Sequence, residues 1–230
     1  SEIGTEVTSI MQSESRALVA GAIGRLGEAL VSALLARGGY REVSVLASGA
    51  VNPGVAGMTV FTADAVPKAR DLFIVLGSDS FNTQRSFHGR DARFTAMDEH
   101  NTLSVATDAV AAGVQRIVLI AASPSWQQFG ALHRGLGAPL ERELGALPIS
   151  RFVVLRPLLE TKSAGGSLMQ RFIHGYLSIQ MLMMPRSIPH LTSQQIAAAA
   201  LVSVGMAEGQ GVAVFSAADI ASLLKPKASG

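Results

Sequence analysis

Arg16-Ala-Leu-Val-Ala-Gly21-Ala-Ile-Gly24-Arg25-Leu-Gly27 is the stretch of this 230-residue chain with the clearest structural meaning. An apolar run ends in three glycines spaced three residues apart, and an apolar pattern of helical period follows at once. The pattern predicts a strand, a tight turn and the start of a helix. Glycine permits turn conformations that a Cβ forbids, and a bare helix N-terminus attracts phosphate. We interpret the stretch as a dinucleotide-binding turn; the alternative is a glycine-rich turn without a ligand.

The composition indicates one α/β domain of enzyme size. Hydrophobic residues make up 48% of the chain and charged residues 16%, and the formal net charge is +2. Without a basic run, no nucleic-acid partner is expected. The chain has no cysteine, which excludes disulfides, thiolate catalysis and cysteine-ligated zinc, and no other metal-ligand spacing is present. No apolar run reaches the roughly 18 residues of a membrane span, and no signal peptide is visible, so we expect a cytoplasmic protein without membrane contact.

The remaining segments alternate between strand and helix patterns. Strands are expected at residues 43–47, 58–62, 72–76, 117–121 and 152–155, and helices over residues 90–112 and 139–147. This order predicts an α/β fold, a doubly wound parallel Rossmann sheet with right-handed crossovers. Residues 63–71 are too few for a crossover helix, so we expect a trimmed helix or a bare loop there.

The pattern changes after the last of these strands. A methionine-rich stretch, Met169 to Met184, either lines a substrate pocket or packs in a core or dimer contact. Thr192-x-x-Gln195 forms a capping box before a helix at 196–204, followed by a strand at 212–215 and a helix at 217–224. We expect a single domain over residues 16–225, in which 158–225 form a small C-terminal helical cap on the substrate side. Residues 1–15 are expected to be a flexible tail or a non-native remnant.

Several motifs together resemble a known family. They are the glycine string G-A-x-G-x-x-G, Ile74-Val-Leu-Gly77-Ser78, the helix start Asp98…Asn101, Ala112-Gly-Val, Ile117-Val-Leu-Ile-Ala and Leu155-Arg156-Pro157. Over about residues 16–225 the chain resembles the atypical short-chain dehydrogenase/reductase superfamily. Within it, the chain is similar to the Tat-interacting-protein-like branch, with the NmrA-like and flavin-reductase-like branches as near relatives. The resemblance implies a Rossmann fold that holds NADP or NAD.

The resemblance also implies where the cofactor binds. The predicted cofactor-binding residues are Gly21, Ile23, Gly24, Arg25, Leu26, Gly27, Ser48, Asp64, Leu76, Gly77, Ser78 and Pro157. Asp64 matches a position that contacts the adenine amino group in the superfamily; its alternative role is to form a turn. NAD-binding proteins place an acid at the end of the second strand, and none stands at residues 46–49. Since Arg25 can face a 2′-phosphate, NADP is favoured and NAD is possible.

The catalytic pattern of the family is absent. Active members carry Tyr-x-x-x-Lys and a nearby Ser or Thr, and these positions fall on His133, Gly137 and Ser123. His133 and Ser123 are therefore the candidates for proton transfer, and the alternative for His133 is an ordinary surface or core histidine. Two functions remain open: an NADPH-dependent reductase of quinones, flavins or similar acceptors, or a non-catalytic dinucleotide-binding sensor or partner protein. Either takes a small molecule and is a monomer or a homodimer.

Overall fold

The computed structural model describes residues 16–37, 39–49, 53–77, 94–123, 135–158, 189–206 and 211–225. Its strands are β1 (Arg16–Ala20), β2 (Glu42–Leu46), β3 (Met58–Phe61), β4 (Asp71–Leu76), β5 (Arg116–Ala121), β6 (Arg151–Arg156) and β7 (Gly211–Ser216). They form one seven-stranded parallel sheet in the order β3-β2-β1-β4-β5-β6-β7. The chain winds outward from β1 in one direction and from β4 in the other. The doubly wound α/β prediction is confirmed.

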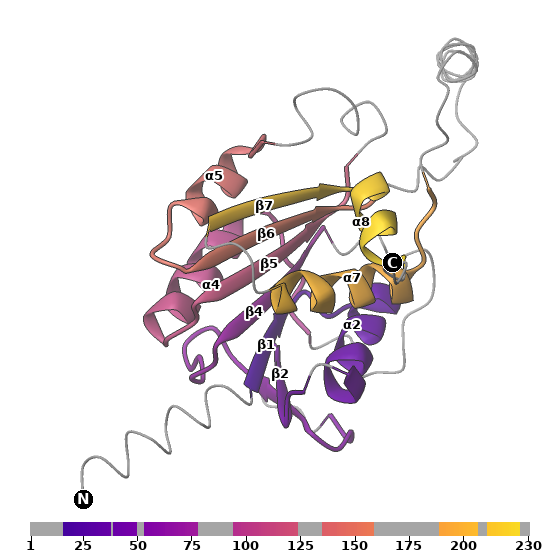
Figure 1. Cartoon of the computed structure of the whole chain (residues 1–230). Coiled ribbons are helices and arrows are strands. Elements are labelled where there is room, and N and C mark those ends of the chain that lie inside the picture. Colours follow the sequence, from indigo (N-terminus) through magenta and orange to yellow (C-terminus); the bar gives the residue numbers. More distant parts are fainter. Residues whose placement is uncertain are drawn as a thin grey trace, which may run out of the picture.

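Helices cover both faces of this sheet (Figure 1). One layer contains α2 (Gly24–Arg37), α7 (Ser193–Gly205) and α8 (Ala217–Leu223), and the other contains α4 (Glu99–Ala111) and α5 (Pro139–Gly145). Alternate strand residues face the two layers: Val19 and Phe73 pack toward α2, whereas Leu18 and Ile74 pack toward α4. Burial on both faces explains why the central strands are apolar without alternation.

The predicted helix over residues 90–112 is wrong at its N-terminal end, because α4 begins only at Glu99. The Asp98 carboxylate accepts hydrogen bonds from the backbone N–H groups of His100 and Asn101, both at 2.9 Å. The Asn101 side chain accepts one in return from the Asp98 N–H. This capping box fixes the helix start. Phe94 and Met97 therefore lie outside the helix in an extended segment.

The β6–β7 connection departs from the prediction of right-handed crossovers. The β1–β2 connection steps toward one edge of the sheet through α2, whereas β6–β7 steps toward the opposite edge through α7. Since α2 and α7 cover the same face, the two connections have opposite hands. The β4–β5 and β5–β6 connections use the other face and share the hand of β1–β2. The β3–β4 connection is a bare loop, which was one of the two predicted alternatives.

The structure describes only part of the predicted cap over residues 158–225, and the described part does not form a separate cap. β7 extends the sheet beside β6, and α7 and α8 belong to the layer that contains α2. Residues 159–188, which include the methionine-rich stretch, lie outside the described residues. The described part of the expected cap is thus built into the three-layer sandwich.

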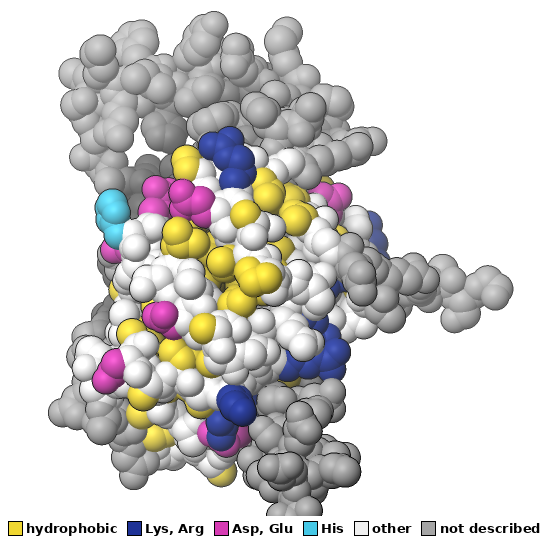
Figure 2. Space-filling model, turned by 90° about the vertical axis from the view of Figure 1, so that its left-hand side faces the viewer, with side chains coloured by type: hydrophobic (Ala, Val, Ile, Leu, Met, Phe, Trp, Pro, Cys, Tyr) yellow, Lys and Arg dark blue, Asp and Glu magenta, His cyan; other side chains and the backbone are white. Residues whose placement is uncertain are grey.

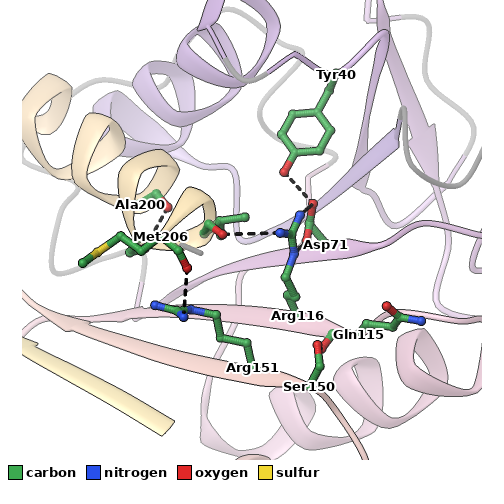
Figure 3. Close-up of polar contacts among 10 residues, drawn as sticks. Tyr40, Asp71, Gln115, Arg116, Ser150, Arg151, Ala200 and Met206 are labelled. Carbon is green, nitrogen blue, oxygen red and sulfur yellow. Dashed lines mark hydrogen bonds and ion pairs between the residues drawn. The ribbon is translucent and has the colours of Figure 1, made fainter. Parts of the chain in front are cut away.

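Two arginines anchor the C-terminal end of α7 (Figure 3). Arg116 donates a hydrogen bond to the Val204 carbonyl at 3.3 Å, and Arg151 donates one to the Met206 carbonyl at 3.2 Å. Arg116 also forms a two-pronged ion pair with the buried Asp71, whose Oδ2 accepts from Nη2 at 2.6 Å. These cations stand where the helix dipole is negative, although α7 has no basic residue of its own in its last turn.

The side of the molecule that carries α4 and α5 mixes both signs of charge. Acidic and basic side chains lie around a central group of hydrophobic ones on that side (Figure 2). Its described part shows no basic stripe of the kind that follows a nucleic-acid backbone. Of the helices described, none is long and apolar enough to cross a membrane.

Candidate dinucleotide site

The glycine turn joins β1 to α2 at the point where the sheet changes winding direction. Gly21 and Gly24 adopt φ angles of 77° and 69°, which L side chains rarely adopt. A Cβ on Gly21 would come within 2.3 Å of the Val75 carbonyl oxygen, and one on Gly27 within 2.3 Å of the Ala22 carbonyl carbon. The turn conformation thus requires glycine at positions 21 and 24. The close packing around the turn leaves no room for a Cβ at positions 21 and 27.

The carboxyl end of β4 forms the opposite wall of this site. Gly77 adopts a φ of 62°, and its N–H donates to the Met97 carbonyl at 2.9 Å. At the other end of the same segment, the Thr95 N–H donates to the Leu46 carbonyl at 3.1 Å. Residues 94–97 therefore cross the carboxyl end of β1, which lies between β2 and β4. The structure brings Leu76 and Gly77 close to the predicted turn.

The start of α2 suits an anionic ligand. Its first turn contains no acidic residue, and Arg25 in that turn is exposed. Leu26 is fully buried in the core, so its side chain packs beneath the turn and does not reach a ligand at the surface. Ile23 is half-buried at the surface. A helix N-terminus without an acid, entered through glycines, fits a pyrophosphate group.

None of residues 47–49, the described residues that follow β2, is acidic. Ala47 is buried there and pairs with Phe94, and the next residue, Ser48, is exposed. Glu42 lies at the amino end of the same strand, where its carboxylate pairs with Arg16 at 2.8 Å. Glu42, the acid nearest in sequence to this strand end, therefore lies at the amino ends of the strands, whereas the site lies at their carboxyl ends. This arrangement lacks the acid that recognises the ribose hydroxyls of NAD.

Asp64 lies in an exposed turn after β3. The Ala65 N–H donates to the Thr62 carbonyl at 3.0 Å, which closes the turn. A hydrogen bond from the Thr62 side chain lowers the pKa of the Asp64 carboxyl, so the group is ionised at neutral pH. These contacts account for Asp64 as a turn residue, and its role at an adenine ring stays a prediction.

Ser123 and Pro157 meet at the carboxyl ends of β5 and β6. The Ser123 N–H donates to the Pro157 carbonyl at 3.0 Å, and only 4% of Ser123 is exposed. Their backbones thus bridge the two strand ends beside the expected nicotinamide position. Ser78 and His133, the other predicted residues of this region, lie outside the described residues.

A buried ion pair occupies the region of the missing lysine. Arg156, at the end of β6, donates to Glu141 through Nη2 at 2.6 Å and through Nε at 3.2 Å. It also donates to the Gly135 carbonyl at 2.8 Å, while the Gly137 N–H donates to Glu141 at 2.8 Å. The pair fixes the segment that leads into α5. Sequence reasoning used Arg156 only as part of a motif and did not predict its partner.

Gly137, the position of the expected lysine, is not part of a helix. The residue after it, Ala138, has φ −76° and ψ 149°, and α5 starts at Pro139. Proline disfavours a helical conformation in the residue before it but is well tolerated at the first helical position. At the position where the resemblance places a helical lysine, the backbone as well as the side chain therefore differs.

Comparisons with known proteins give similarities of fold. No family model matches the sequence, and no curated protein matches it. A UDP-N-acetylglucosamine 4-epimerase from Bacillus cereus has a TM-score of 0.47 and 12% identity, over 90% of this chain and 83% of that one. A short-chain dehydrogenase/reductase superfamily protein from Agrobacterium tumefaciens with bound NAD has a TM-score of 0.45 and 19% identity, over 91% and 80%. A Rossmann-fold NAD(P)-binding family protein from Shigella flexneri has a TM-score of 0.46 and 12% identity, over 86% and 89%.

Proposed function

We propose that this chain binds NADP(H), in preference to NAD(H), at the carboxyl edge of its sheet. The observation that carries the proposal is the glycine turn. Gly21 and Gly24 hold left-handed conformations at the winding switch, and Gly27 lets α2 approach the turn closely. Ligands of open α/β sheets bind at this switch point, and a pyrophosphate is the group that such a turn and helix start accommodate.

The preference for NADP(H) follows from charge. The carboxyl end of β2 carries Ala47 and Ser48 in place of an acid, so it does not repel a 2′-phosphate. Arg25 is exposed in the first turn of α2, next to the glycines, and supplies a cation close to the proposed pyrophosphate position. An arginine–phosphate contact is charge-assisted and geometrically specific.

We further propose that the chain reduces acceptors such as quinones or flavins. The bound cofactor supplies a hydride, and the protein positions the two reactants. Reduction of a ketone needs a proton donor at the developing alkoxide, whereas a conjugated quinone or flavin spreads the charge itself. The expected lysine position is a non-helical glycine and Ser123 is almost fully buried, which favours acceptors that need little help from a proton relay.

The same observations support a second candidate, a dinucleotide-binding sensor or partner protein without catalysis. Both candidates keep the glycine turn, and they differ only in turnover. Incubation with NADPH and a panel of quinones and flavins separates them, because only the reductase oxidises NADPH faster than a protein-free control. A panel without turnover, together with measurable NADPH binding, leaves the sensor as the function.

Calorimetric titration of the wild type and of Arg25→Ala tests the binding proposal. We expect NADPH to bind the wild type more tightly than NADH. Loss of the arginine should cost about tenfold or more in NADPH affinity, corresponding to about 1.4 kcal/mol, and much less in NADH affinity. Absence of binding of either cofactor to the wild type would overturn the proposal. Equal losses for the two cofactors would show that Arg25 does not contact the 2′-phosphate.

A further inference from the structure

The outer faces of α2 and α7 form a groove of about 1270 Å³. Its central lining consists of small or apolar residues, Ala29, Ser32, Ala33 and Ala36 from α2 and Ala198, Leu201, Val202 and Gly205 from α7. The members from α7 follow the helical spacing i, i+3, i+4 and i+7, so they make one continuous stripe. We define this surface as the α2/α7 face.

Beyond its first turn, where Gln194 and Gln195 are exposed, α7 is apolar on both of its sides. Its 13 residues include no charged side chain. One side, with Ile196 and Ala200, packs in the core. On the other side Val202 is 42% exposed, and Met206 just after the helix is 39% exposed. A helix that is hydrophobic all round is normally buried between two layers, and the described residues supply only one.

Charge on the α2/α7 face is confined to its ends. Arg25 and Glu28, of opposite sign, lie at the end near the glycine turn. Arg116 lies at the other end, where Asp71 neutralises it. The outer surface of α4 differs, since Glu99, His100 and Asp108 are all exposed there. A charged peptide, a nucleic acid or an anionic lipid surface finds no counter-charge along the middle of the α2/α7 face.

We infer that the α2/α7 face binds the same face of a second copy of this chain, in a two-fold homodimer. A face without central charge is complementary to itself, because its copy brings no like charge against it. α2 and α7 have 14 and 13 residues, so each is about 20 Å long, and together they present roughly 400 Å² in projection. Specific pairs bury roughly 600–1,000 Å² of accessible surface per partner, so these two helices alone account for about half of the area that a stable pair needs.

Sedimentation velocity of the full chain, with Val202→Glu and Val55→Glu, tests this inference. Val55 is 46% exposed and lies between β2 and β3, so the control adds the same charge to an equally exposed valine elsewhere. We expect a concentration-dependent dimer for the wild type and for Val55→Glu. In Val202→Glu the dissociation constant should rise about tenfold or more, because the new charge enters twice across the two-fold axis. A wild type that stays monomeric, or a dimer equally strong in both variants, overturns the inference.

Disulfide trapping supplies a readout that does not depend on the folding of a charged variant. Because the chain has no cysteine, Ala198→Cys and Val55→Cys each introduce a single thiol. Under mild oxidation Ala198→Cys should form a covalent dimer several times faster than Val55→Cys. Equal rates would exclude the α2/α7 face as the contact. Neither measurement involves a nucleotide, so failure here leaves the cofactor proposal untouched.

Discussion

Gly21 and Gly27 make different demands on the same turn. Gly21 needs a positive φ and lies against the Val75 carbonyl and Met97, whereas Gly27 has an ordinary helical position but no room for a Cβ. The backbone of Ala22 is the obstacle at Gly27, and backbone cannot rotate away as a side chain can. Both glycines therefore act through the absence of a Cβ, which lets neighbouring backbone approach closely.

Gly27→Ala should therefore destabilise the protein and weaken NADPH binding together. Forcing α2 away from the turn costs about 1–3 kcal/mol of unfolding free energy, as overpacking does elsewhere. Urea unfolding with and without NADPH measures both effects. Gly49→Ala is the control, because a Cβ there meets nothing within 4 Å. Equal stability of the two variants would mean that α2 does not pack as described.

Tyr40 couples stability to alkaline pH. Its hydroxyl donates to Asp71 at 2.6 Å (Figure 3). Its ring packs edge-on against Phe73. Burial first, and then the negative charge of Asp71, raise the pKa of the Tyr40 phenol well above its usual value. The unfolded chain releases this proton near pH 10 while the folded protein retains it. Stability is therefore fully present below pH 10 and falls as the pH rises further.

Tyr40→Phe should remove that alkaline dependence. The free energy of unfolding of the wild type should fall above pH 10 by up to about 1.4 kcal/mol per pH unit more than that of the variant. Near pH 7 the variant should lose about 1–2 kcal/mol, because Asp71 loses a hydrogen bond. Chemical unfolding at several pH values between 8 and 11 measures both differences. Parallel pH profiles would contradict the assignment.

At the scale of elements, α7 depends on contacts at both of its ends. The Thr192 hydroxyl accepts from the Gln195 N–H at 3.3 Å, and the Gln195 side chain accepts from the Thr192 N–H at 2.9 Å. The other end is held by Arg116 and Arg151 from the strands. Because the two sides of α7 differ little in polarity, the contacts at its two ends determine where the helix begins and ends.

Thr192→Ala should lower the free energy of unfolding by about 1 kcal/mol, the usual cost of losing an N-terminal cap. Thr107→Ala in the exposed middle of α4 is the matched control, since its hydroxyl bonds only to the Leu103 carbonyl of its own helix. The control should be neutral or slightly stabilising, because alanine favours helix more than threonine. Thermal unfolding compares the two, and equal losses would argue against the cap.

α5 limits which chemistry can be restored by substitution. His133→Tyr with Gly137→Lys recreates the side chains of the family pattern but leaves Pro139 at the start of the helix. Because Gly137 stands outside the helix, the new lysine should not be positioned as in active members. We expect ketone reduction to stay at background in this variant, in an assay of NADPH oxidation. Robust activity would show that the residue types alone were missing.

Local sequence patterns predicted helices and strands better than they predicted the contacts between them. The apolar run before Gly21 and the capping box at Thr192 were read correctly, because both are local patterns. Periodicity placed the start of α4 too early, since Phe94 and Met97 fit a helical period although they pair with strand ends. The helix start at Asp98…Asn101, part of the resemblance, is confirmed. The Arg156–Glu141 pair joins residues from different elements, and local pattern carries no signal for such a contact.

At the scale of the molecule, one prediction failed for a reason that no local pattern contains. The apolar residues of α7 show that one side of it packs on the sheet, but both faces of a parallel sheet accept a helix equally well. α4 and α5 already cover one face beside β5 and β6, and α7 lies beside α2 on the other (Figure 1). The hand of the β6–β7 connection is thus set by which face is still uncovered.

That late helix has a consequence for how the protein is made. Strands β5 and β6 leave the ribosome with one apolar face still bare, because α7 begins only at Ser193. At about 5–20 residues per second, the interval between the end of β6 and the end of α7 lasts about 2–10 s. Throughout that interval the nascent chain presents one apolar face of β5 and β6 to solvent or to a chaperone. Slowing the emergence of residues 157–205 from the ribosome should therefore increase aggregation, whereas slowing the emergence of the later residues should not.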